Sequence, residues 1–168
     1  IGNSSDLSAA LAGTITVHTA PTTITNSDYT VTELKAINNA TTGVITLTDP
    51  YVALNGSSSD LSAALAGTLI GNHRGPIMIT NNDYTVSELK AINTATTGNI
   101  TFVFNTTALS GTAADLVAAF SGTYTEYSGN ITIIDTPTTT QLEVIDAATT
   151  GTITVVGGSG SNPEGSVT

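Results

Sequence analysis

Residues 30–38 have the sequence Thr-Val-Thr-Glu-Leu-Lys-Ala-Ile-Asn, and residues 85–93 repeat it with a single change, serine for the second threonine. A diverged third copy, Thr-Gln-Leu-Glu-Val-Ile-Asp, spans residues 140–146. A threonine three residues before Glu or Gln is the pattern of a capping box, in which each partner bonds a free amide at the start of a helix. The apolar residues that follow lie on one helical stripe. The pattern predicts helices that begin near Thr30, Thr85 and Thr138.

A second stretch recurs with the same spacing. Residues 5–14, Ser-Asp-Leu-Ser-Ala-Ala-Leu-Ala-Gly-Thr, return unchanged at residues 59–68, and residues 115–123 form a diverged third copy. Aspartate is a favoured helix cap, so we expect shorter helices that begin near Asp6, Asp60 and Asp115. Three units of about 54 residues follow from the two recurring stretches.

After each longer helix the hydrophobic period changes from that of a helix to that of a strand. Glycine at positions 43, 98 and 151 is expected to end each helix in the left-handed conformation. Alternating Ile, Thr and Phe then predict strands around residues 45–47, 100–104, 131–133 and 153–155. Strands that alternate with helices favour parallel pairing. We therefore predict an α/β fold: a solenoid-like repeat array with units at 1–56, 57–111 and 112–156.

Two kinds of segment fall outside the repeated frame. Residues 14–21, 68–76 and 123–130 vary between the units and are expected to hold a short strand or a loop. Residues 157–168 are rich in Gly and Ser without periodicity, which is typical of a linker or exit segment.

The charge balance limits the classes of partner. The 168 residues carry 13 acids against three bases, a net charge of −10, and only 10% of the residues are charged. Such a chain repels phosphate backbones and anionic membranes, and it has no apolar stretch long enough for a membrane helix, so we expect neither nucleic acid binding nor membrane insertion. The absence of cysteine excludes disulfides and thiol nucleophiles, and the composition favours export. The start at Ile1, without a signal peptide, indicates a piece of a longer chain.

No catalytic constellation is evident. His18 and His73 are the only histidines, and both stand in variable segments, where a lone histidine is usually a surface residue. A catalytic site is singular, whereas nearly every polar residue here recurs in a repeated structural role. The sequence therefore predicts a protein that is not an enzyme and that requires no cofactor.

Calcium is the one metal for which donors recur. Asp28, Asp49, Asp83 and Asp135 follow expected strands, where carboxylates and free carbonyls supply the oxygen ligands that calcium takes. The alternative is that these aspartates form turns and caps. Both alternatives stay open at this point.

The segment from Thr30 to Leu47 resembles repeats in very large bacterial surface and secreted proteins, including giant adhesin-like proteins of cyanobacteria and proteobacteria. The resemblance covers residues 4–156. It implies an extracellular or cell-surface location, a long tandem array, and scaffolding or adhesion, with no catalytic residues.

Two functions follow as hypotheses. The first is a non-catalytic structural module, such as a spacer, sheath, surface layer, filament or adhesin stalk. Its ends would contact other copies or neighbouring repeats, because a cut array leaves apolar ends. The alternative is a module that binds a glycan or protein through the three variable segments, and a groove lined by Tyr124 and Tyr127 would favour it.

Overall fold

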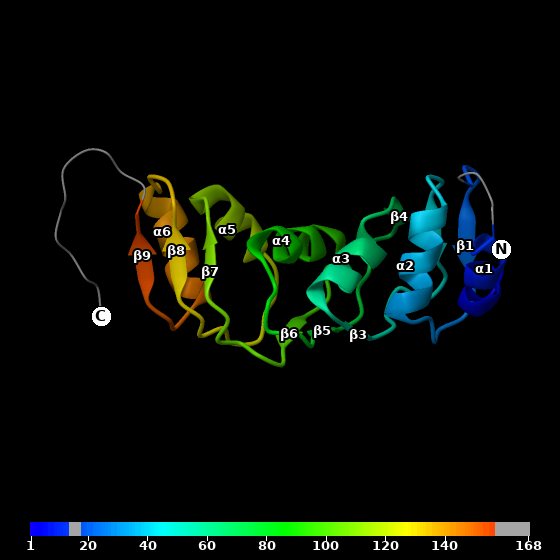
Figure 1. Ribbon diagram of the computed structural model, residues 1–168, viewed down its shortest axis with the longest axis horizontal. Helices are drawn as coiled ribbons and strands as arrows, with labels where there is room; N and C mark the ends of the chain where they lie inside the picture. The colour runs from blue at the N-terminus through cyan, green and yellow to red at the C-terminus, as the bar shows by residue number, and fades with distance from the viewer. Residues whose placement is uncertain (14–17, 157–168) are drawn as a thin grey trace.

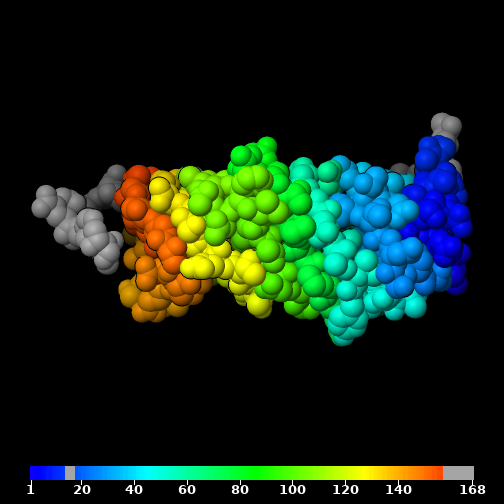
Figure 2. All heavy atoms as spheres, turned by 90° about the horizontal axis from the view of Figure 1, so that it is seen from below, coloured from blue at the N-terminus to red at the C-terminus, as the bar shows by residue number. Residues whose placement is uncertain are grey.

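The computed structural model describes residues 1–13 and 18–156, so the predicted linker at 157–168 and part of the first variable segment lie outside the described residues. Within these ranges the chain is mixed α/β, with six helices and three small parallel sheets and no closed barrel. The molecule is elongated, and its elements follow one another along the long axis from α1 to β9 (Figure 1). In the space-filling view successive parts of the chain accordingly form successive bands (Figure 2).

The three longer helices begin where the capping boxes predict. They are α2 (Val31–Ala40), α4 (Val86–Ala95) and α6 (Thr139–Ala148). In α2 the Thr30 hydroxyl accepts a hydrogen bond from the Glu33 amide, while the Glu33 carboxylate accepts one from the Thr30 amide at 2.9 Å. Both bonds of the box are also present in the other two helices.

The three shorter helices start earlier than predicted. They are α1 (Ser4–Leu11), α3 (Ser58–Leu65) and α5 (Ala113–Ala119), and their caps are Asn3, Ser57 and Thr112. The prediction that Asp60 is the cap is wrong, because the Ser57 hydroxyl accepts from the Asp60 amide and leaves aspartate as the third helical residue. Asp6 and Asp115 stand at the same third position.

Within the ranges that the structure describes, nine short strands form three parallel sheets of three strands each. The first contains β1 (Thr22–Ile24), β2 (Ile45–Leu47) and β4 (Leu69–Ile70); the second, β3 (Leu54–Gly56), β5 (Ile77–Ile79) and β6 (Ile100–Phe102); the third, β7 (Leu109–Gly111), β8 (Ile131–Ile133) and β9 (Ile153–Val155). Among the described residues every pair of strands is parallel, which confirms the predicted pairing. The variable segment 68–76 contains β4. The sequence pattern did not predict β3 and β7.

Each sheet takes strands from both sides of a predicted unit boundary. The boundary between residues 56 and 57 falls between β3 and α3, yet β2 pairs with β4 across it, and β3 pairs with β5. The same holds at residue 111, where β7 pairs with β8. A single unit of about 54 residues therefore does not contain a whole sheet.

Buried side chains form one continuous apolar cluster along the molecule. Leu34, Ile37, Leu89 and Ile92 have no exposed surface, as predicted. The corresponding Leu142 is only partly buried, because no element of the described chain covers its side of α6.

Two buried tyrosines donate hydrogen bonds from their hydroxyls to main-chain carbonyls. The Tyr29 hydroxyl donates to the Asp49 carbonyl at 2.9 Å, and Tyr84 donates to the Phe104 carbonyl at 2.6 Å. Phe104 was expected to continue the buried alternation of β6. That expectation is wrong: the strand ends at Phe102, and 47% of the Phe104 surface is exposed.

The predicted role of glycine after the longer helices is wrong. The residues that cap α2, α4 and α6 at the C-terminal end are threonines in extended conformation, Thr41, Thr96 and Thr149. The following glycines have no positive φ. Glycine is needed there because the backbone segments that lead into neighbouring strands nearly touch. A Cβ atom on Gly98 would overlap the Gly75 carbonyl.

Candidate functional site

The most specific surface contact lies between α2 and α3, which we call the first seam. The Lys35 ammonium donates to an Asp60 carboxylate oxygen at 2.5 Å. One turn further along α2, the Asn38 side-chain amide donates to the Ala63 carbonyl at 2.8 Å. Two positions of the longer helix, the fifth and the eighth, therefore bind the third and sixth positions of the shorter helix.

The second seam, between α4 and α5, repeats this geometry. Lys90 donates to Asp115 at 2.6 Å, and Asn93 donates to the Ala118 carbonyl at 2.9 Å. The hydrogen bond from Lys90 holds the pKa of Asp115 below its ordinary value, as Lys35 does for Asp60. Both ion pairs are roughly half exposed, so they set register and specificity more than stability.

The C-terminal end of the described chain presents the same side of α6 without a covering helix. The fifth and eighth helical residues there are Glu143 and Asp146, in place of lysine and asparagine. Together with Leu142, Ile153 and Val155 they line an open groove of about 400 Å³. We call these five residues the C-terminal face.

The opposite end presents α1, whose eight residues have the same sequence as α3. Asp6 occupies the position that Asp60 has in the first seam. Asp6 is exposed and forms no ion pair within residues 1–13 and 18–156. We call Asp6 and Ala9, the third and sixth residues of α1, the N-terminal face.

The four aspartates proposed for calcium each accept a hydrogen bond, and for three of them the partner is two residues away. Asp28 and Asp83 accept from the side-chain amides of Asn26 and Asn81, at 2.6 Å in both cases. Asp49 accepts from the Tyr51 amide at 3.0 Å.

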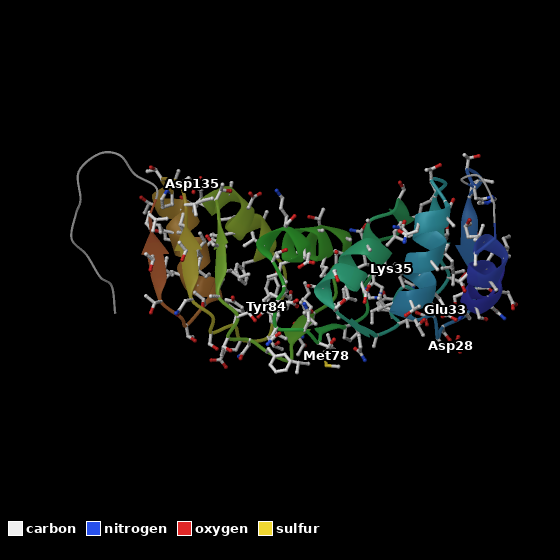
Figure 3. All side chains as sticks on the ribbon, viewed as in Figure 1. Asp28, Glu33, Lys35, Met78, Tyr84 and Asp135 are labelled. Carbon is white, nitrogen blue, oxygen red and sulfur yellow. The ribbon has the colours of Figure 1, made fainter. Side chains whose placement is uncertain are left out.

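Asp135 differs from the other three, because it accepts from the Ala113 amide at the first residue of α5. Asn26 and Asn81 make that bond to α1 and α3, so Asp135 corresponds to these asparagines. Asp28 and Asp135 also lie near opposite ends of the molecule (Figure 3). In the part of the chain that the structure describes, no three His, Cys, Asp or Glu side chains gather into a group that could hold a metal ion.

Calcium binding stays a prediction that a melting experiment tests. Because a ligand that binds only the folded form raises the melting temperature by mass action, calcium at a native site would shift the transition upward. Since each aspartate already forms a turn or cap bond, we expect the same midpoint in millimolar calcium and in chelator. A rise in calcium that Asp83→Asn abolishes would establish a calcium site instead.

The two histidines differ in how far they are exposed to solvent. His18 is partly buried, whereas His73 has no exposed surface, so the expectation of a surface residue is wrong for His73. Its Nε2 lies 2.8 Å from the Val52 carbonyl and must carry the proton, since a carbonyl only accepts. Burial lowers the pKa of His73 from its ordinary value of 6.5, because the charged form loses its hydration.

A pH dependence follows from this shift. At pH below 6.5 the unfolded chain takes up a proton that buried His73 resists, so stability is full above that pH and falls as the pH drops. The slope from this group is at most about 1.4 kcal/mol per pH unit. We expect the His73→Gln protein to lack this fall in stability with decreasing pH. Urea unfolding of both proteins between pH 7 and pH 5 measures the difference, and identical slopes would contradict the prediction.

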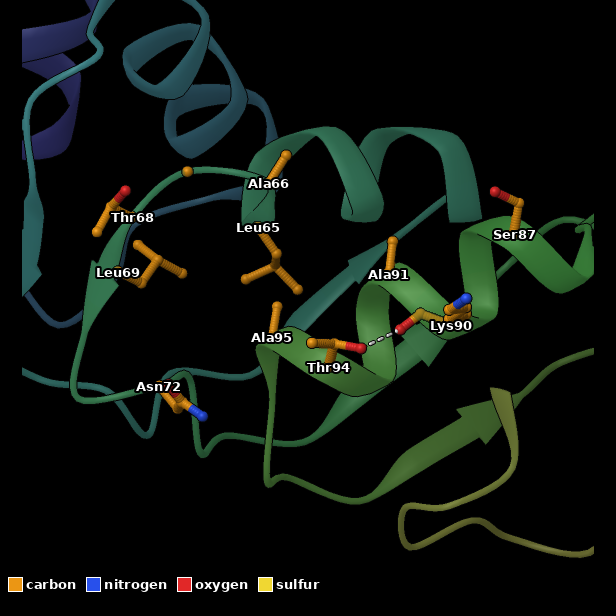
Figure 4. A pocket seen from close by; sticks show the side chains of 11 residues that line it. Leu65, Ala66, Thr68, Leu69, Asn72, Ser87, Lys90, Ala91, Thr94 and Ala95 are labelled. Carbon is orange, nitrogen blue, oxygen red and sulfur yellow. Dashed lines mark hydrogen bonds between the residues drawn. The ribbon is translucent and has the colours of Figure 1, made fainter. Parts of the chain in front are cut away.

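A cavity of about 630 Å³ lies beside the second variable segment. It is formed by the end of α3, by β4 and by the outer side of α4, with Leu65, Leu69 and Ala95 on its apolar side and Thr94 and Lys90 on its polar side (Figure 4). The Thr94 hydroxyl donates to the Lys90 carbonyl at 2.8 Å.

The expected aromatic-lined groove is present beside the third variable segment: Phe120, Tyr124 and Tyr127 line a hollow of about 390 Å³, while their rings also pack against one another. Tyr127 is 1% exposed and its hydroxyl donates to the Thr107 carbonyl, which corresponds in position to the bond of His73. Tyr124 is partly buried and stacks on Phe102, with ring centroids 6.0 Å apart. These aromatic residues also fill the core.

Sequence reasoning missed the seams and a polar network behind them. The Ser58 hydroxyl donates to the Glu88 carboxylate at 2.9 Å, and Ser4 donates to Glu33 at 3.0 Å. The third unit has alanine and glutamine at these two positions. The paired replacement of Ser with Ala and Glu with Gln was the visible signal for a contact between them.

Comparisons with protein-family models, curated proteins and solved structures found no match to this chain. Among the described residues, no helix has the length and apolar character needed to cross a membrane.

Proposed function

We propose that the chain is a non-catalytic structural repeat module of a secreted or cell-surface protein, in which units of about 54 residues stack as a solenoid-like array. Such a module serves as a spacer in a sheath, surface layer, filament or adhesin stalk. Each unit of an array is stabilised by its neighbours, which suits an extended and stiff element. The ends would contact neighbouring repeats or further copies.

One observation carries this proposal: the two seams are the same contact made twice. Lysine to aspartate and asparagine to carbonyl recur between α2 and α3 and between α4 and α5. Polar side chains that are used for such contacts are not available for catalysis. The recurrence also means that further units can be added through the same contact.

The proposal predicts a constant gain in length for each added unit. A second copy of residues 57–111, inserted after residue 111, would join Lys90 to the new copy of Asp60. Small-angle scattering should then show a longer particle with an unchanged cross-section. A control insertion of equal length made of Gly and Ser adds length without that rigid cross-section. If the chain with the second copy of residues 57–111 is longer but also has a wider cross-section, the proposed array is wrong.

The alternative is a module that binds a glycan or protein. The cavity beside residues 68–76 favours it, because that cavity combines apolar and polar walls. Thr94→Trp would fill the cavity from α4 without entering the core. Binding of a glycan or protein that this variant abolishes would support the alternative.

A further inference from the structure

The C-terminal face consists of residues that are covered wherever they recur inside the molecule. Leu34 and Leu89, which correspond to Leu142, have no exposed surface, and Leu142 is only partly buried. Phe102 is 8% exposed, whereas Val155 at the same place in its sheet is 47% exposed. In both seams the covering element is a short helix, α3 or α5.

The two acidic residues of this face change which helix can cover it. A covering helix of the α3 type would bring an aspartate next to Glu143, where lysine stands in the seams. Like charges at such a distance repel each other. Asp146, unlike Asn38 and Asn93, has no proton to donate to the carbonyl of a covering helix.

We propose that the C-terminal face docks an α/β unit whose short helix carries Lys or Arg at its third position and a donor side chain at its sixth. The base at the third position would pair with Glu143. Lys, Arg, Asn or Gln at the sixth position would donate to Asp146. Apolar residues on the inner stripe of that helix, as Leu61 and Leu65 provide in α3, would cover Leu142 and Val155.

The charges of this chain exclude its own segments as that occupant. The N-terminal face carries Asp6 at the third position and Ala9 at the sixth, so a second copy would oppose two acids and supply no donor. Residues 157–168 contain neither Lys nor Arg. The inference rests on the proposed function. It limits the partners of the C-terminal face to neighbouring units and excludes copies of the same chain.

A charge-exchange experiment in the intact chain tests the proposal, because α1 can be given the required chemistry. The N-terminal variant is Asp6→Lys with Ala9→Lys. The C-terminal variant is Glu143→Lys with Asp146→Asn, which restores the residues of the seams. A fourth protein carries all four substitutions. Sedimentation velocity at low and high salt gives the oligomeric state of each protein. Thermal melting, followed by circular dichroism, confirms that each protein is folded.

We expect the wild type and the fourth protein to be monomers, because their ends have like charges. Each variant with one altered end should associate head to tail, with an apparent Kd about tenfold or more below that of the wild type and a marked loss of association in high salt. Labelled N-terminal variant should also bind unlabelled wild type, measured by fluorescence anisotropy.

The proposal fails if the N-terminal variant is folded and stays monomeric, or if it associates equally well when the C-terminal face carries lysine. Association of the wild type through its ends would likewise overturn it. The length measurement on added units depends only on the internal seams, so its outcome is independent of these results.

Discussion

Replacing Leu89 with alanine is expected to destabilise the protein by about 2–5 kcal/mol. The side chain has no exposed surface and lies in the apolar cluster between neighbouring units. Truncation removes its transfer free energy and leaves a cavity, because α4 is held in place by helices on both sides. Chemical denaturation, followed by circular dichroism, measures the loss.

The matched control is Leu142→Ala. Leu142 occupies the same fourth position in α6, but that side of α6 has no covering helix in the described chain. Water already reaches the site and can fill the space that truncation leaves, so we expect less than about half the loss seen for Leu89. Equal losses would mean that the C-terminal face is as well packed as the seams, which would contradict the structure.

The second large effect is expected at Gly98, where alanine should cost at least about 2 kcal/mol. The bends before β5 and β6 approach so closely here that a Cβ atom would overlap the Gly75 main chain. Backbone atoms cannot move aside as a flexible side chain can. The strands would have to separate, which would weaken the bond from the Thr97 amide to the His73 carbonyl, now 2.9 Å long.

Gly13→Ala is the control, because a Cβ atom on Gly13 meets nothing within 4 Å. Its expected change is within about 0.5 kcal/mol, as for other surface substitutions. Both variants are compared with the wild type by urea unfolding at one pH. A Gly98→Ala protein as stable as the Gly13→Ala protein would show that the strands tolerate a wider separation.

The elements that could be predicted from the sequence are those whose cause is local. A capping box acts within four residues, so Thr30 and Thr85 located their helices correctly. The apolar stripe is equally local, and it identified Leu34 and Leu89 as buried. Parallel pairing was predicted from the alternation of helices and strands, because this order of elements is typical of parallel sheets.

Apart from the caps of the shorter helices, the errors at Gly98 and His73 concern residues whose role depends on a partner more than 20 residues away. Gly98 was assigned a conformation, but its neighbour Gly75, in the bend before β5, decides that only glycine fits. His73 was assigned to the surface because it is a lone histidine in a variable segment, whereas it binds Val52 and Thr96 in the interior. Tyr127 lines the expected groove but is almost wholly buried, because its hydroxyl donates to the Thr107 carbonyl 20 residues earlier.

The sequence by itself determined the recurring stretches, the starts of the three longer helices and the parallel pairing of strands, because helix caps and hydrophobic periods act over one or two turns of chain. Only the tertiary structure decided which side of each helix is covered, and by what. The role of the fifth and eighth helical positions depends on contacts with residues 25 positions away in the sequence. These contacts join Lys35 to Asp60 and Asn38 to Ala63. Glu143 and Asp146 looked like ordinary surface acids until those contacts were known. They occupy the positions at which Lys35 and Asn38 of α2 bind the following short helix.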